Sequence, residues 1–160
     1  MTAFEFTKYQ GTGNDFIMID NREEFFPHDR EWIEHLCDRR FGIGTDGLIL
    51  LQRHPDYDFR MVYYKSDGRE SSMCGNGGRC ICAFAAQLGV VKPGQKITFE
   101  AVDGMHEAEL IETISHGYIV DLKMTDVDSM ENTGNTAILN TGSPHFVKTV
   151  ENVDMLDIIA

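Results

Sequence analysis

One stretch of the chain, residues 72–88, constrains the fold more than any other. It begins with SMCGNGG and continues, over residues 79–88, with helix-forming residues that present an apolar face. Three glycines among residues 74–78 are too many for the middle of a helix, so we expect a loop that opens directly onto a helix at Arg79. Gly89 then stands where helices commonly end. The fold must therefore include one prominent helix that a glycine-rich loop precedes.

Short segments with the apolar patterns of strands occupy much of the remaining chain. They are residues 4–9, 16–20, 47–51, 59–64, 96–101, 105–112, 118–124, 137–140 and 145–150. The first two flank a GTGND turn and should form a hairpin. A further helix is expected to begin at Asp29, because Ile33 and Leu36 follow at helical spacing. These patterns predict a strand-rich α+β fold.

The polar segment 126–136 is expected to be a connection and a lobe boundary. We therefore predict one lobe over residues 1–125 and the start of a second over residues 126–160. The sequence closes with MLDIIA, which is typical of the interior of a helix or strand. We expect the sequence to stop short of a complete protein.

Charge and composition argue against several classes of protein. The formal net charge is -12, which opposes binding to nucleic acid or to an acidic membrane surface. No apolar run approaches the length that spans a bilayer, and the first residues lack the pattern of a secretory signal. The four cysteines lack the spacing of a zinc site, so we expect neither a metal nor a disulfide framework. A cytoplasmic location follows.

The loop before the helix has the features of a small anion site. N–H groups at a helix start have no intrahelical acceptor, the helix dipole favours negative charge there, and glycines allow close approach of a carboxylate. Cys74 lies at the mouth of this site, where the helix end favours a thiolate. A thiolate there can remove the proton from the carbon that bears the carboxylate, while the N–H groups stabilise the developing charge. Inversion of that carbon then requires a second acid on its opposite face.

Three other interpretations of Cys74 and its loop stay open. A phosphate-binding loop would explain the glycines, but the segment contains neither GxxxxGK[ST] nor GxGxxG. A cysteine nucleophile would need a histidine partner, for which His145 is the only candidate, and nothing in the sequence positions it. A purely structural cysteine is the third interpretation.

Four motifs, in chain order, resemble those of the diaminopimelate epimerase family. They are GTGNDF at residues 11–16, RFGIGTDGL at 40–48, DG at 67–68 followed by MCGNGGRC at 73–80, and GSPH at 142–145. The resemblance implies two similar lobes, each with mixed or antiparallel strands wrapped around a central helix, of which the second only begins here. It also implies interconversion of LL- and meso-diaminopimelate, toward lysine and peptidoglycan, without cofactor or metal, and a homodimer.

Site residues carry over from the resemblance position by position. Cys74 resembles one of the family's two catalytic cysteines, and Gly75 and Asn76 resemble its backbone cradle for the α-carboxylate. Asn14 resembles the asparagine that helps to hold the reacting end of this amino-acid substrate. Without the resemblance, Asn14 would be interpreted as a turn residue.

Three departures from the family pattern limit what carries over. Lys65 and Ser143 stand where many members have asparagines that contact the distal end of the substrate. Lys65 is either a partner for a carboxylate or a solvated lysine. The family's second cysteine lies in a later CG[ST]G motif, which does not occur before Ala160. We therefore expect this polypeptide alone not to epimerise diaminopimelate at a useful rate.

Two alternative functions stay open. One is a racemase or epimerase of another amino acid such as proline or hydroxyproline; proline racemases carry a histidine where Asn76 stands, which argues against it. The other is a truncated homologue without catalytic activity, which the missing second cysteine would favour.

Overall fold

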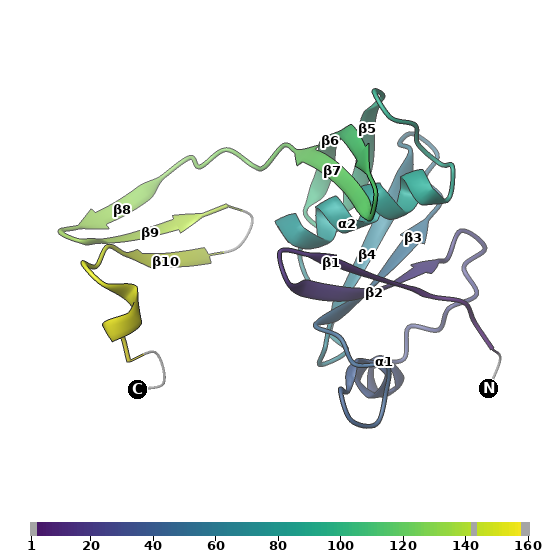
Figure 1. Cartoon of the computed structure of the whole chain (residues 1–160), viewed down its shortest axis with the longest axis horizontal. Coiled ribbons are helices and arrows are strands. Elements are labelled where there is room, and N and C mark those ends of the chain that lie inside the picture. Colours follow the sequence, from purple (N-terminus) through teal and green to yellow (C-terminus); the bar gives the residue numbers. More distant parts are fainter. Residues whose placement is uncertain (1–2, 142–143, 158–160) are drawn as a thin grey trace. The chain divides into compact units, whose positions relative to one another are not determined.

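The computed structural model describes residues 3–141 and 144–157, and the chain divides into two compact units between Lys123 and Met124 (Figure 1). The elements in chain order are β1 Thr7–Gly11, β2 Asn14–Asp20, α1 Arg30–Cys37, β3 Gly47–Gln52, β4 Phe59–Lys65, α2 Gly75–Gln87, β5 Lys96–Ala101, β6 Gly104–Ile114, β7 Gly117–Leu122, β8 Met130–Thr133, β9 Thr136–Asn140, β10 Pro144–Lys148 and the 3₁₀ helix Val153–Met155. None of the helices described is long and apolar enough to cross a membrane.

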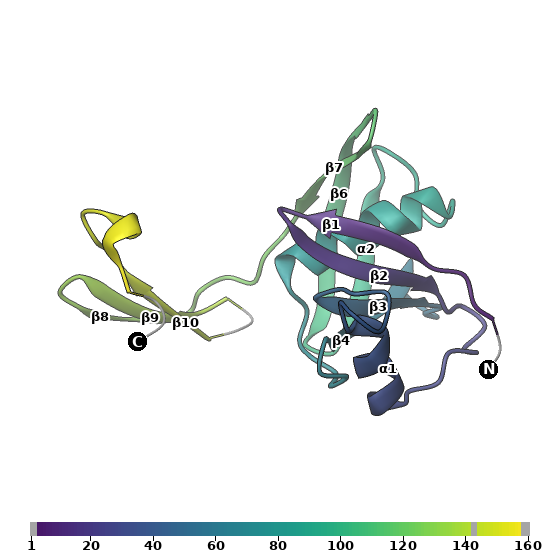
Figure 2. The ribbon, with the colours of Figure 1, turned by 60° about the horizontal axis from the view of Figure 1, so that its bottom comes forward.

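The first unit is a seven-stranded sheet whose strands follow chain order from β1 to β7. The β2–β3 and β4–β5 pairs are parallel and the other four pairs are antiparallel. The sheet curls around α2, which contacts strands at both ends of the sheet, β1 and β7 among them (Figure 2). The predicted α+β fold with mixed strands around a central helix is confirmed.

Two apolar clusters cover the two faces of this sheet. Phe16, Ile49 and Met61 pack with α2 on one face, and alternate strand residues such as Ile17 and Leu48 pack with α1 on the other. Because the central strands are buried on both faces, they appear in the sequence as continuous apolar runs. The α1 helix begins as predicted, with Asp29 as its N-cap residue.

The α2 helix begins earlier than the sequence predicts. Its first residue is Gly75, not Arg79, and Cys74 is the N-cap residue. The glycines of this first turn meet close neighbours: a Cβ atom at Gly78 would lie 2.7 Å from Leu122 Cδ2, and one at Gly77 would lie 3.0 Å from Ile49 Cδ1. Tertiary crowding therefore explains glycines that helix propensity alone would exclude. Gly89 has a φ of 72° just after the helix, as expected for a helix stop.

The second unit contains a three-stranded antiparallel sheet in the order β10-β9-β8. Strand β8 lies inside the segment that we predicted to be a connection, so that prediction is wrong for residues 130–133. Strand β8 has the sequence MENT, and three of its four residues are polar, so it shows no apolar alternation. It pairs with β9 through a turn at Gly134, which has a φ of 61°.

Candidate active site

Cys74 caps the first turn of α2 through its sulfur atom. The Gly77 N–H donates to Cys74 Sγ at 3.2 Å, and the Gly78 N–H donates to the Cys74 carbonyl at 2.8 Å. The N–H groups of Gly75 and Asn76 come before the first donor that an intrahelical carbonyl can accept. The half-buried thiol and these N–H groups therefore belong to the same helix start.

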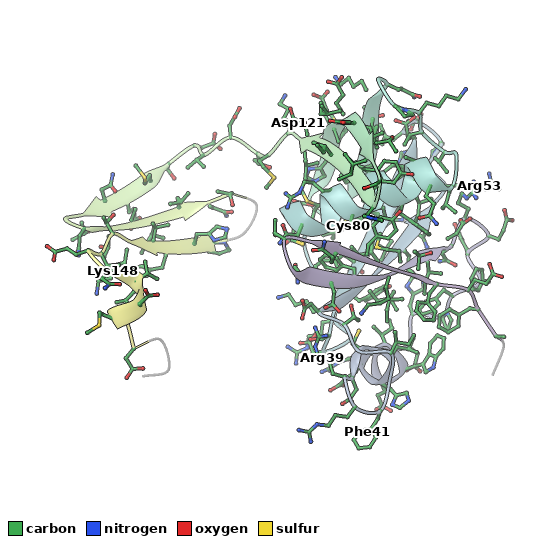
Figure 3. All side chains as sticks on the ribbon, viewed as in Figure 1. Arg39, Phe41, Arg53, Cys80, Asp121 and Lys148 are labelled. Carbon is green, nitrogen blue, oxygen red and sulfur yellow. The ribbon has the colours of Figure 1, made fainter. Side chains whose placement is uncertain are left out.

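The other three cysteines have different surroundings. Cys37, Cys80 and Cys82 are buried, and burial raises the thiol pKa to about 11, about 11 and about 12, respectively. Cys80, labelled in Figure 3, lies on α2. Cys74 is only half-buried, so it is the cysteine of this chain that a reagent reaches most easily.

Tyr63 lies beside Cys74 on the α2 face of the sheet. Burial, followed by the nearby Cys74, raises the pKa of Tyr63 to about 12, so its phenol stays neutral at physiological pH. The ring packs edge-on against Phe16, and a Cβ atom at Gly47 would lie only 2.6 Å from Tyr63 Cε2. The glycine at the start of β3 therefore makes room for this ring.

The turn between β1 and β2 touches the first turn of α2. Thr12 and Gly13 have φ angles of 55° and 88° and connect Gly11 to Asn14. The Thr12 hydroxyl lies 3.0 Å from Asn76 Oδ1, and a Cβ atom at Gly11 would lie 3.2 Å from the Asn76 carbonyl oxygen. The structure thus brings Asn76 against the turn that leads into Asn14.

Asn14 is held by a cluster of charged side chains. Its Nδ2 donates to Asp46 Oδ2 at 2.8 Å. Arg39 lies 2.7 Å from Asp15 and 2.8 Å from Asp46, and Lys8 lies 2.7 Å from Asp15. The Arg39 guanidinium, more than Lys8, holds the pKa of Asp15 well below its usual range, and the bond from Asn14 is the largest cause that lowers the pKa of Asp46. Both carboxylates are therefore ionised, and Asp46 fixes the orientation of the Asn14 amide.

Our sequence analysis missed this cluster. It interpreted Asp46 as a residue that caps or hydrogen-bonds its turn, without a catalytic role, and it did not consider Lys8, Asp15 or Arg39 as site residues. The available signal was that the GTGNDF and RFGIGTDGL motifs each carry an aspartate. Arg39, labelled in Figure 3, follows α1 and reaches back to both of these aspartates.

Lys65, the last residue of β4, and Asn14, the first residue of β2, lie where these strands end on the same side of the sheet. Strand pairing aligns Phe16 with Gly47 and Gly47 with Lys65, and Asn14 precedes Phe16 by two residues. Because successive side chains alternate between faces, Asn14 and Lys65 share the α2 face with Phe16. Lys65 is exposed. Ser143, the other departure from the family pattern, lies outside the described residues.

A cavity of about 710 Å³ lies between β1, α2 and the turn that joins β6 to β7. Its lining includes Lys8, Tyr9, Arg79, Cys80 and His116, but not Cys74. The thiol that the sequence singles out therefore lies outside this hollow.

The chain is similar to known proteins over nearly all its length. The family model for diaminopimelate epimerase matches residues 6–127. A diaminopimelate epimerase of Flavobacterium psychrophilum is 53% identical over 94% of this chain and 57% of its own length. One of Chlorobaculum tepidum is 42% identical over 93% of this chain and 58% of its own. The chain thus spans less than two thirds of the length of these relatives.

Solved structures share the fold at low sequence identity. A phenazine biosynthesis protein of the PhzF family from Bacillus anthracis is 14% identical and aligns with a TM-score of 0.74 over 96% of this chain and 58% of its own. A hydroxyproline epimerase from Agrobacterium vitis is 18% identical and aligns with a TM-score of 0.54 over 89% of this chain and 44% of its own.

Proposed function

Because the chain belongs to the diaminopimelate epimerase family, we propose that it contributes one of two proton-transfer cysteines, Cys74, to the epimerisation of LL-diaminopimelate to meso-diaminopimelate. The chain spans 57% of the length of the Flavobacterium psychrophilum relative. The proposal therefore concerns only the share of the active site that these residues supply.

The observation that carries the proposal is the position of Cys74 at the start of α2. Its half-buried sulfur accepts from the Gly77 N–H, next to the N–H groups of Gly75 and Asn76. These two N–H groups would bind the α-carboxylate of the substrate. The α-hydrogen of the same carbon would then lie within reach of the sulfur.

The proposed reaction uses only proton transfers. The Cys74 thiolate takes the α-proton and becomes a thiol, and the electron pair of the broken C–H bond moves into the carboxylate, which becomes enediolate-like. The N–H groups of the helix start stabilise this charge. A second thiol then gives its proton to the opposite face of the carbon, which inverts it. No cofactor or metal takes part.

The second thiol is not one of the other three cysteines of this chain. Cys37, Cys80 and Cys82 are buried, and burial raises the pKa of each. The Flavobacterium relative extends well beyond the region that matches, and we place the second cysteine in that additional part.

Asn14 and Lys65 would contact other parts of the substrate. The amide of Asn14, fixed by Asp46, would hold the reacting end, and Lys65 would pair with the distal carboxylate. Asn14 and Lys65 lie at neighbouring strand ends and on the same face of the sheet, which supports this arrangement.

Alkylation near neutral pH tests the proposed site on the chain itself. We expect iodoacetamide to modify Cys74 well before the three buried cysteines, and LL-diaminopimelate to slow the modification. Peptide mapping by mass spectrometry identifies the site, and Cys74→Ser is compared with Cys37→Ala. Modification of Cys80 first would contradict the assignment, and stronger protection by L-proline would favour a racemase of that amino acid.

Incubation with LL-diaminopimelate in heavy water tests whether these residues supply only one of the two proton-transfer groups. We expect no net formation of the meso form, and at most a slow loss of the α-proton signal that Cys74→Ser abolishes. Proton NMR follows both. Complete conversion to the meso form by these 160 residues would show that they contain both acids.

A further inference from the structure

We infer that Thr12 and Arg79 are positioning residues that fix Asn76, and with it the first turn of α2, against the turn that carries Asn14. The inference rests on the proposed function, because it explains how the carboxylate-binding N–H groups beside Cys74 are held in place. Neither Thr12 nor Arg79 needs to touch the substrate.

The contacts converge on one atom. Thr12 Oγ1 lies 3.0 Å from Asn76 Oδ1, and Arg79 Nη2 donates to the same oxygen. Thr12 comes from the β1–β2 turn and Arg79 from the next turn of α2, so Asn76 Oδ1 joins segments 64 residues apart in the chain. Because guanidinium groups only donate, Arg79 also fixes which end of the Asn76 carboxamide faces it. The three side chains form a clamp, which we define as Thr12, Asn76 and Arg79.

The backbone of Thr12 indicates that this contact has a cost. Thr12 has a φ of 55°, in the left-handed region that β-branched residues rarely adopt. A glycine would take this conformation without strain. Strained residues of this kind often persist at functional sites, where the surrounding structure holds them. Here the threonine places a hydroxyl group on Asn76 that a glycine could not supply.

A merely local role for the hydroxyl is the competing explanation. Thr12 Oγ1 also lies 2.7 Å from the Gly11 carbonyl oxygen, so it could act only within its own turn. The two explanations differ in the role of Asn76: a local role predicts the same effect of Thr12 whether or not the Asn76 side chain is present, and the clamp predicts that the effect disappears without it.

The clamp fixes two proposed substrate contacts relative to each other. Asn76 contributes a backbone N–H to the carboxylate site, and Asn14 begins β2 two residues after Thr12. A Cβ atom at Gly11 would lie 3.4 Å from Asn76 Cβ, so the backbones already meet closely, and the clamp side chains add polar contacts there. Loosening the clamp should weaken carboxylate binding beside Cys74 more than it weakens the fold.

The experiment compares two alkylating reagents on Cys74. Iodoacetate carries a carboxylate and iodoacetamide does not, and each forms an S–C bond while iodide leaves. The ratio of their rates at Cys74, relative to the ratio for a small free thiol, measures carboxylate attraction by the helix start. We expect the native chain to show a raised ratio despite its net charge of -12. A native ratio no higher than that of the free thiol would contradict the proposed function itself.

Neutral or charge-preserving variants then test the clamp. We expect Thr12→Gly to lower the ratio about five-fold, because it removes the contribution of one hydrogen bond. In urea unfolding, this variant should lose no more stability than the added flexibility of glycine explains. Thr12→Ser should restore most of the ratio, and Arg79→Lys should lower it although the charge remains. Glu24→Gly is the control for glycine at a left-handed position, because Glu24 has a φ of 52° in the β2–α1 connection. It is compared with Glu24→Gln, so that both proteins lack the same negative charge.

The double variant decides between the two explanations. In an Asn76→Ala background, Thr12→Gly should cause no further fall in the ratio, because effects that pass through a shared partner are not additive. An equal fall in both backgrounds would overturn the inference, as would an unchanged ratio in Thr12→Gly or a fall in Glu24→Gly of the same size. In each of these cases a raised native ratio would leave the proposed function intact.

Discussion

The two units of the chain differ in whether their sheets enclose a core. In the first unit, Phe16, Ile49, Ile81 and Phe99 are among many apolar side chains with no exposed surface. In the second unit, no residue among 124–141 and 144–157 is buried, and apolar side chains such as Phe146 lie 68% exposed. Both units have hydrogen-bonded strands, but among the residues that the structure describes only the first unit packs a helix inside its sheet.

This difference predicts that strand pairing alone does not make the second unit a stable lobe. A sheet becomes stable by burying an apolar face against another layer. The α2 helix provides that layer for the first unit, and it also carries Cys74 at its start. The element that organises the core is therefore the element that positions the candidate site. The three-stranded sheet of the second unit has the apolar residues for a buried face and leaves them exposed.

The largest effect should come from truncating a phenylalanine in each unit. Phe99 is fully buried and stacks on Phe59 with ring centroids 5.1 Å apart. We expect Phe99→Ala to reduce the free energy of unfolding by about 3–5 kcal/mol, because it leaves a cavity. Phe146→Ala should change it by less than about 0.5 kcal/mol. Urea unfolding of both variants measures the contrast, and comparable losses would show that the second unit has a core of its own.

A smaller effect on stability should come from adding a methyl group at a tightly packed glycine of the first unit. Replacing glycine by alanine inside a helix normally adds about 1 kcal/mol of stability. At Gly78 the added Cβ would meet Leu122 Cδ2 at 2.7 Å, so we expect Gly78→Ala to cost about 1–2 kcal/mol instead. Gly117→Ala, which has open space, is the control and should be nearly neutral. Thermal unfolding distinguishes the two, and a stabilised Gly78→Ala would show that Leu122 yields easily.

These contrasts also show what the sequence can predict about the fold. Nine strands were predicted because their segments carry apolar residues in a strand pattern, including β10, whose residues are all exposed. Strand β8 was missed because three of its four residues are polar. The start of α2 was misplaced because local propensity treats Gly77 and Gly78 as helix breakers. Their neighbours Ile49 and Leu122 come from distant strands, so the crowding that requires glycine is invisible locally.

The candidate site was partly predictable for a similar reason. Cys74 and Asn76 lie in one continuous motif, and a helix start has the same chemistry wherever it occurs. The charged cluster depends on pairs such as Asp15 and Arg39, which are 24 residues apart and meet only because β2 and β3 lie side by side. Hydrophobic periodicity carries no information about such polar contacts.

The charged cluster should give the first unit an acid-dependent share of its stability. Arg39 holds the pKa of Asp15 below its ordinary value of 3.8, so the folded state favours the ionised carboxylate. This stabilisation is complete above about pH 5 and is lost as the pH falls through the folded-state pKa. We expect Asp15→Asn to cost about 1 kcal/mol at pH 7 and to remove a similar part of the loss in acid. Urea unfolding from pH 7 to 2 measures it, and equal acid losses in both proteins would contradict the assignment.

The smallest effect should come from removing the second unit altogether. If the core around α2 stabilises the first unit by itself, residues 1–123 should unfold cooperatively, with a midpoint in urea close to that of the whole chain. The isolated peptide 124–160 should show no cooperative transition, because a three-stranded sheet without a packed face is marginal in water. Circular dichroism during urea titration of the three polypeptides tests both statements. A large loss of stability in residues 1–123 would mean that the exposed strands support the core. The two units would then differ in burial but would depend on each other for their stability.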